Sequence, residues 1–114
     1  MTTVYKIIAA DTWQAATASG AFIGAGIDLN DGYIHLSTGA QARRTAELYF
    51  KGQDNLVLVA VDGSSLGAAL KYEPSRGGDL FPHVYGPLPL TAVLSMRPLP
   101  LAPDGNHVFP EDVD

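Results

Sequence analysis

The stretch Asn55-Leu56-Val57-Leu58-Val59-Ala60-Val61 decides the fold of this chain, and the turn signal Asp62-Gly63 follows it. The run is apolar without the alternation of a half-exposed strand, which is typical of a strand covered on both faces. It therefore predicts a central strand of a sheet, with further elements packed on each side.

A helix is expected just before this strand, over residues 39–51. Thr38 and Gln41 have the spacing of a capping box, which satisfies free N–H groups at a helix start. One apolar face of the helix is predicted by four residues at helical spacing: Ala42, Ala46, Tyr49 and Phe50.

The N-terminal third predicts a strand over residues 3–9 and a helix over residues 12–19. Asp11 is expected to cap that helix and Gly20 to end it. Residues 20–32 are rich in glycine and in turn-forming side chains, so they are expected to form a loop that approaches a ligand closely.

Four further strands are expected, at residues 33–37, 70–73, 81–85 and 90–97. Because the helices come early and the strands late, the class is α+β, with a mainly antiparallel sheet and two helices near the N-terminus. We expect one domain over residues 1–98. Prolines and acids dominate residues 99–114, which predicts an extended or frayed tail.

The composition narrows the classes of function. The chain has no cysteine, which excludes disulfides and thiol chemistry. Seven basic and twelve acidic residues give a net charge of −5, so general binding to nucleic acid is not expected. No apolar run approaches the roughly 20 residues that span a membrane. We therefore expect a cytoplasmic protein without membrane contact.

Two short segments set a histidine among strand formers: Asp31-Gly32-Tyr33-Ile34-His35-Leu36-Ser37-Thr38 and Phe81-Pro82-His83-Val84-Tyr85-Gly86. Side chains alternate across a strand, so each segment presents a row of polar and aromatic groups. Glu73 lies on a third such strand. If these strands meet, they line one cleft, and His35, Glu73 and His83 are the candidate catalytic residues because they supply acid–base groups.

Candidate binding residues lie around the same segments. Ser37 and Thr38 stand where a strand becomes a helix, a place that favours an anion. Arg76 adds a positive charge near Glu73. His35, His83 and Glu73 are suitable metal ligands, but their spacing matches no zinc motif, and no metal is expected.

Each of these residues also has a plain structural explanation. A strand histidine is more often a hydrogen-bonded structural group than a catalyst, and Glu73 before Pro74 can be an exposed strand end. Ser37 and Thr38 are adequate helix caps. Arg76 can close a turn, and Tyr85 can pack against its neighbours.

The same segments resemble a known family. The two histidine segments, together with Tyr5-Lys6-Ile7, Gln41, Tyr49-Phe50 and Tyr72-Glu73, are similar to the small bacterial domain-of-unknown-function family 952 over about residues 3–97. That family is grouped by fold with the ADP-ribosyltransferase superfamily. The resemblance implies a split, strongly bent sheet that holds NAD or an ADP-ribose-like group in a central cleft.

The resemblance also implies roles for single residues. His35 with Ser37 and Thr38 resembles the element that holds the ribose and nicotinamide end, although Leu36 stands where glycine is common. Tyr85 or Tyr72 would stack on nicotinamide. In the superfamily a late glutamate activates the acceptor, whereas here Glu73 comes before His83.

The expected function is therefore a cleft for NAD or a related nucleotide, used as substrate in an ADP-ribosyl-type transfer. In that reaction His35 would position the ribose diol and Arg76 the pyrophosphate, while Glu73 would act as base or ribose partner. The alternative is a non-catalytic module that binds a small metabolite or a peptide end in the same cleft. A third possibility is a structural domain in which the histidines make only hydrogen bonds.

Overall fold

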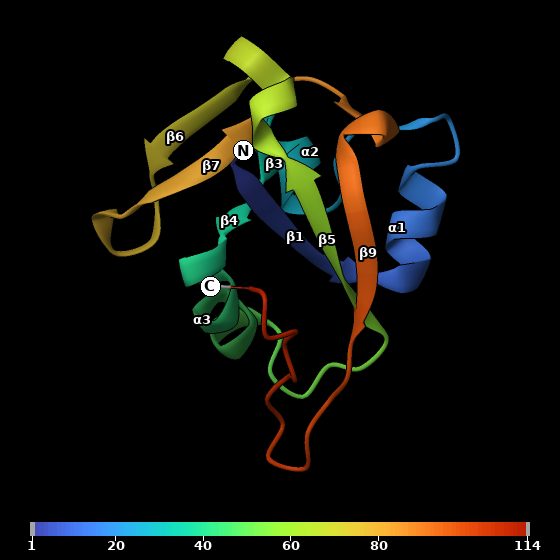
Figure 1. Ribbon diagram of the computed structural model, residues 1–114, viewed down its shortest axis with the longest axis vertical. Coiled ribbons are helices and arrows are strands. Elements are labelled where there is room, and N and C mark those ends of the chain that lie inside the picture. The colour runs from blue at the N-terminus through green and yellow to red at the C-terminus, as the bar shows by residue number, and fades with distance from the viewer. Residues whose placement is uncertain (1, 114) are drawn as a thin grey trace.

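The computed structural model describes residues 2–113, which form two main antiparallel sheets joined along one edge. The four-stranded sheet has the order β4-β1-β5-β9, and the three-stranded sheet has the order β3-β7-β6. A small β2-β8 pair lies apart from both. Figure 1 shows the larger sheet crossing the middle of the molecule, with β6 and β7 projecting to one side. The expected α+β class with a split antiparallel sheet is confirmed.

The strands occupy the following residues: β1 Thr3–Ala9, β2 Ala21–Phe22, β3 Ile34–His35, β4 Ser37–Thr38, β5 Leu56–Asp62, β6 Leu70–Pro74, β7 Leu80–Val84, β8 Leu88–Pro89 and β9 Val93–Leu99. The α-helices are α1 Ala10–Ala16, α2 Ile27–Asp31 and α3 Gly39–Tyr49. Short 3-10 turns cover Gly63–Ala69, Arg76–Gly78 and Leu90–Ala92. Among these residues no helix has the length and apolar character needed to cross a membrane.

Strand β5 is the central strand that its composition predicts. It pairs with β1 on one side and with β9 on the other, and residues 56–61 are all buried. Val57, Val59 and Val61 face one hydrophobic cluster, whereas Leu56, Leu58 and Ala60 face a second. Because its side chains alternate, a strand that is apolar at every position needs cover on both faces.

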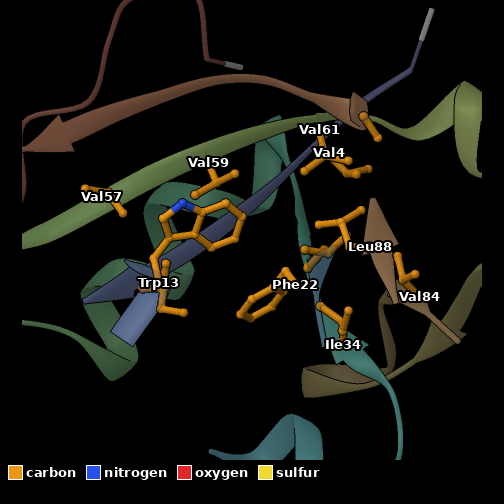
Figure 2. Close-up of a cluster of buried hydrophobic side chains, with 12 residues drawn as sticks. Val4, Trp13, Phe22, Ile34, Val57, Val59, Val61, Val84 and Leu88 are labelled. Carbon is orange, nitrogen blue, oxygen red and sulfur yellow. The ribbon is translucent and has the colours of Figure 1, made fainter. Parts of the chain in front are cut away.

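The two clusters are covered by different helices. On one face Trp13 of α1 packs against Phe22, with ring centroids 5.0 Å apart, beside the three valines of β5. Figure 2 shows this cluster extending to Ile34, Val84 and Leu88, so the core also holds the three-stranded sheet in place. On the other face Ala42 and Ala46 of α3 allow close approach to the sheet.

Leu36 is the point at which the chain passes from one sheet to the other. His35 pairs with His83 in the three-stranded sheet, whereas Ser37 pairs with Tyr5 in the four-stranded sheet. The backbone N–H of Leu36 donates to the carbonyl of Pro82 at 3.0 Å, which joins the two sheets at this residue. The single strand predicted over residues 33–37 is therefore two short strands.

Two expectations about the N-terminal third are wrong. Helix α1 begins at Ala10 with Ala9 as its cap, because β1 runs directly into the helix and Asp11 falls in its first turn. A carboxylate in the first turn interacts favourably with the helix dipole, but the side chain of Asp11 does not cap the helix. Residues 20–32 form a short strand and the helix α2 in place of an open loop, so the chain has a third α-helix beyond the two expected.

The C-terminal segment, which the sequence predicts to be extended or frayed, packs against the rest of the described chain. Val113 is fully buried in the cluster under α3, and Arg43 of α3 donates to the carbonyls of Pro110 and Val113. Arg97 of β9 and Asp112 form an ion pair at 2.9 Å. In Figure 1 this end of the chain returns along the base of the molecule to lie beside α3. Val113 and Arg43 therefore hold in place a segment whose composition predicts an extended chain.

Candidate functional site

The two predicted histidines face each other across neighbouring strands. His35 on β3 is in register with His83 on β7, and side chains in register project from the same face of a sheet. Their ring centroids lie 5.3 Å apart in an edge-to-face arrangement. The register of β3 with β7 therefore joins two segments that are far apart in the sequence.

His35 is fixed by a buried carboxylate, Asp28 of α2. Oδ1 of Asp28 lies 2.6 Å from Nδ1 of His35 and also accepts the backbone N–H of His35 at 3.1 Å. Lys6 of β1 donates to both oxygens of Asp28, at 3.1 and 2.8 Å, and to the carbonyl of His35 at 3.0 Å. Asp28 is 2 % exposed. This buried Lys6–Asp28 ion pair sets the orientation of the imidazole.

The charge of Asp28 is stabilised by these contacts. Burial alone would raise the pKa of Asp28, but the ammonium of Lys6 and the hydrogen bonds from Lys6 and His35 lower it below its ordinary value. Asp28 is thus an anion at neutral pH. A buried anion that accepts from Nδ1 of a histidine leaves Nε2 as the ring nitrogen available to other groups.

His83 is oriented by Glu73 in the same manner. Nδ1 of His83 lies 2.8 Å from Oε1 of Glu73 on β6, and the hydroxyl of Tyr85 donates to the same oxygen at 2.8 Å. The hydrogen bonds from His83 and Tyr85 lower the pKa of Glu73, and the bond to Glu73 raises the pKa of Tyr85. Glu73 is therefore ionised and a weak base at neutral pH, which suits it to stabilise positive charge.

Tyr33 lies at the centre of this cluster. Its ring centroid is 4.7 Å from that of His35, 4.4 Å from that of His83 and 5.2 Å from that of Tyr85. The ring is stacked on His83 and tilted toward the other two. We call Tyr33, His35, Glu73, His83 and Tyr85 the histidine cluster. It is an aromatic cluster with two carboxylate-bound imidazoles; the side chain of His35 is 27 % exposed, whereas that of His83 is 3 % exposed.

A groove of about 220 Å³ adjoins the histidine cluster at Tyr33, and the buried Asp28 also lines it. Its remaining walls are mainly apolar: Ile23, Leu29, Gly32, Ile34, Val84, Gly86 and Pro87. Pockets that enclose a drug-sized molecule measure roughly 300–1,000 Å³. The groove therefore has room for one ring system, and the rest of a larger ligand would extend over the histidine cluster.

Arg76, a predicted binding residue, lies on the face of the three-stranded sheet that carries Glu73 and His83. Its guanidinium lies 4.8 Å from the ring of Phe81 and 5.8 Å from the ring of Tyr49, and it donates to the hydroxyl of Thr45 at 3.2 Å. Phe81 pairs with Glu73 across β6 and β7. Arg76 thus flanks the histidine cluster at the end that lies away from the groove.

Three predicted binding residues lie elsewhere. Ser37 is buried and its hydroxyl bonds to that of Thr45 at 3.2 Å, so it belongs to the contact between β4 and α3. Thr38 caps α3, and with Gln41 it forms the predicted capping box. Tyr72 neighbours Glu73 on β6, so its side chain projects from the opposite face of the sheet.

Sequence reasoning missed Asp28, Lys6 and Tyr33. Asp28 lies among turn formers, and nothing in its surroundings indicates that the tertiary structure buries it. Lys6 is separated from Asp28 by 22 positions, so only the folded chain pairs them. Tyr33 carried a usable signal, because it lies two residues before His35 and alternation places both on one face. Within residues 2–113 no group of three or more His, Asp or Glu side chains is arranged to hold a metal ion.

Comparisons with known proteins agree with the resemblance to the domain-of-unknown-function family 952. Residues 7–96 match the model of a family described as a protein of unknown function, DUF952. The crystal structure of protein CC0527 from the bacterium Caulobacter crescentus is similar, with 50 % identity over 94 % of both chains and a TM-score of 0.88. The solution structure of CC0527 has 51 % identity over 93 % of this chain and 91 % of that chain, with a TM-score of 0.82. No curated protein matches.

Proposed function

This chain belongs to the DUF952 family, and we propose that it binds a nucleotide-like ligand, with NAD as the first candidate, at the histidine cluster and the adjoining groove. The observation that carries the proposal is the position of Tyr33, whose ring contacts both imidazoles and also lines the groove. A flat heterocycle stacks well on such a surface. The groove accepts a single ring, which is the size of a nicotinamide or a nucleobase.

Polar groups next to Tyr33 suit the remainder of a nucleotide. Both hydrogen bonds to Glu73 go to Oε1, so across the described chain its Oε2 has no partner and can accept from a ribose hydroxyl. Arg76 lies beyond Phe81 and supplies a positive charge for phosphate. The groove, Glu73 and Arg76 therefore supply candidate sites for the ring, the sugar and the phosphate around the histidine cluster.

The same residues support an ADP-ribosyl-type transfer. The bond from the anomeric carbon to nicotinamide breaks, and its electron pair leaves with nicotinamide. The acceptor forms a bond to that carbon and passes its proton to Nε2 of His83. Positive charge builds on the sugar as the bond breaks, and the ionised Glu73 stabilises it. His83 takes the role of base because the lowered pKa of Glu73 makes that carboxylate a poor proton acceptor.

A titration followed by 15N-HSQC spectra tests binding, with NAD, ADP-ribose and nicotinamide in parallel. We expect saturable shifts at Tyr33, His35, His83 and Gly86, which line the cluster and the groove. Tyr33→Leu should abolish them, whereas Tyr72→Leu on the opposite face of β6 is a matched control and should leave them unchanged. If millimolar NAD and ADP-ribose give no shifts, the nucleotide proposal is wrong.

Release of free nicotinamide separates the enzyme from the binding module. A protein that binds NAD but releases no nicotinamide with any acceptor would be the non-catalytic alternative. If turnover occurs, His83→Gln should abolish it while NAD still shifts the resonances of Tyr33. Loss of binding and turnover together would assign His83 to ligand binding alone.

A further inference from the structure

The second ring nitrogen of His35 faces another carboxylate of the same helix. Nε2 of His35 lies 3.1 Å from Oδ2 of Asp31, the last residue of α2. Nδ1 already lies 2.6 Å from Asp28. Both nitrogens can donate at the same time only when the ring carries two protons, so this pair of contacts belongs to the imidazolium form.

The two carboxylates differ in how firmly they are held. Asp28 accepts from Lys6, from the backbone N–H of Ala25 and from two groups of His35. The carboxylate of Asp31 has His35 as its one hydrogen-bond partner among the described residues, and a third of the Asp31 side chain is exposed. A partly exposed pair of this kind is weak and is screened by salt. Asp31 can therefore leave Nε2 by a side-chain rotation while Asp28 stays in place.

The charges explain what would replace Asp31. Lys6 and an imidazolium at His35 carry two positive charges, and the buried Asp28 offsets one of them. Asp31 neutralises the remaining charge of this imidazolium form. The aromatic rings of Tyr33 and His83 pack against His35 and provide no anion on that side. When Asp31 leaves, the positive N–H group at Nε2 of His35 is left without an anion and matches an oxyanion.

We propose that Asp31 is a placeholder for an oxyanion of the ligand, which displaces Asp31 and binds Nε2 of His35. This deepens the proposed function, because it adds a second anion site for the ligand, at His35, to the phosphate site at Arg76. Asp31 also lowers the affinity for any anion that cannot compete with it. The site is thereby selective for ligands that fill the groove and supply the oxyanion together.

Substitution of Asp31 tests this directly, with Asp54→Asn as the matched control. Asp54 is an equally charged, exposed residue outside the site, so both variants change the net charge by the same amount. The parent and both variants are titrated at constant ionic strength with inorganic phosphate, nicotinate and nicotinamide, followed by 15N-HSQC spectra. Nicotinate and nicotinamide share a ring and differ in the carboxylate, and phosphate tests the other oxyanion.

We expect Asp31→Asn to bind phosphate, nicotinate or both about fivefold more tightly, which is the factor for loss of one partly exposed ion pair. Nicotinamide affinity should change less than twofold, and Asp54→Asn should match the parent. Adding His35→Gln to Asp31→Asn should remove the gain. The probe that gains identifies the source of the oxyanion.

Equal or weaker oxyanion binding by Asp31→Asn would overturn the proposal, as would an equal gain in Asp54→Asn. Absence of oxyanion shifts at His35 in all three proteins would overturn it as well. A parallel titration with NAD keeps the two proposals apart. If Asp31→Asn gains affinity for phosphate while NAD binds neither protein, the placeholder stands and the nucleotide proposal fails.

Discussion

Replacing Asp28 by asparagine should strongly destabilise the protein. The amide keeps the shape of the side chain but removes the charge, so the Lys6 ammonium, whose side chain is 12 % exposed, remains buried without an anion. Asp28 now accepts hydrogen bonds from Lys6, Ala25 and His35. In asparagine the amide nitrogen, which is itself a donor, would face one of these three donors. Breaking a buried ion pair by removing one partner costs about 3–5 kcal/mol.

That cost is a large share of the total stability. A chain of 114 residues has a free energy of unfolding of about 6–17 kcal/mol. With an unfolding entropy of about 2.1 cal/mol/K per residue, the total entropy of unfolding is about 240 cal/mol/K, so the expected loss lowers Tm by about 13–21 °C. Asp31→Asn on the same helix is the matched control, and it should cost no more than about 1 kcal/mol.

Urea unfolding followed by the fluorescence of Trp13 measures these differences, because this tryptophan is buried in the core. The folded-state pKa of Asp28 is lowered, so its stabilisation is present above its unfolded pKa and is lost as the pH falls through the folded value. The gap between parent and Asp28→Asn should therefore shrink below about pH 4. Adding Lys6→Met should recover part of the loss, because it removes the unpaired charge.

The ion-pair reasoning would be refuted if Asp28→Asn cost less than about 1 kcal/mol, or no more than Asp31→Asn. It would also be refuted if the double variant lost as much as the two single variants together. In either case His35 would be held mainly by the register of β3 with β7.

Three further predictions concern other parts of the molecule. Tyr85→Phe should raise the pKa of Glu73 toward its ordinary value, because Glu73 then loses one of its two hydrogen bonds, whereas the control Tyr72→Phe should leave that pKa unchanged. Titration of the Glu73 carboxyl 13C resonance measures both, and an unchanged pKa in Tyr85→Phe would contradict the prediction. Thr38→Ala should cost about 1 kcal/mol by removing the cap of α3, yet leave ligand affinity unchanged, so a loss of binding in titrations would restore Thr38 to the site. Val113→Ala should cost about 2 kcal/mol in urea unfolding, since Val113 is fully buried, whereas the exposed Val108→Ala should stay within about 0.5 kcal/mol, and equal losses would mean that the tail does not pack.

Much of the fold follows from local patterns in the sequence. The apolar run of β5 predicts its place between two clusters, because each of its faces needs cover. The Thr38 and Gln41 pair predicts the start of α3, since a capping box depends on residues three positions apart. Alternation along the strands predicts that Tyr33 and His35 share a face. These features depend on neighbours in the chain, which the sequence displays directly.

Tertiary structure alone decided which polar groups meet. His35 and His83 are 48 positions apart, and the register of β3 with β7 places their rings 5.3 Å from each other. The break at Leu36 takes Ser37 into the other sheet and away from His35. Asp28 lies in a segment rich in turn-forming residues, but the packing of α2 buries its side chain against Lys6. The sequence by itself therefore determined the central strand β5, the helix α3 and the candidate histidines. Long-range pairing decided which carboxylates orient those histidines, because the energy of a buried charge depends on partners from distant segments.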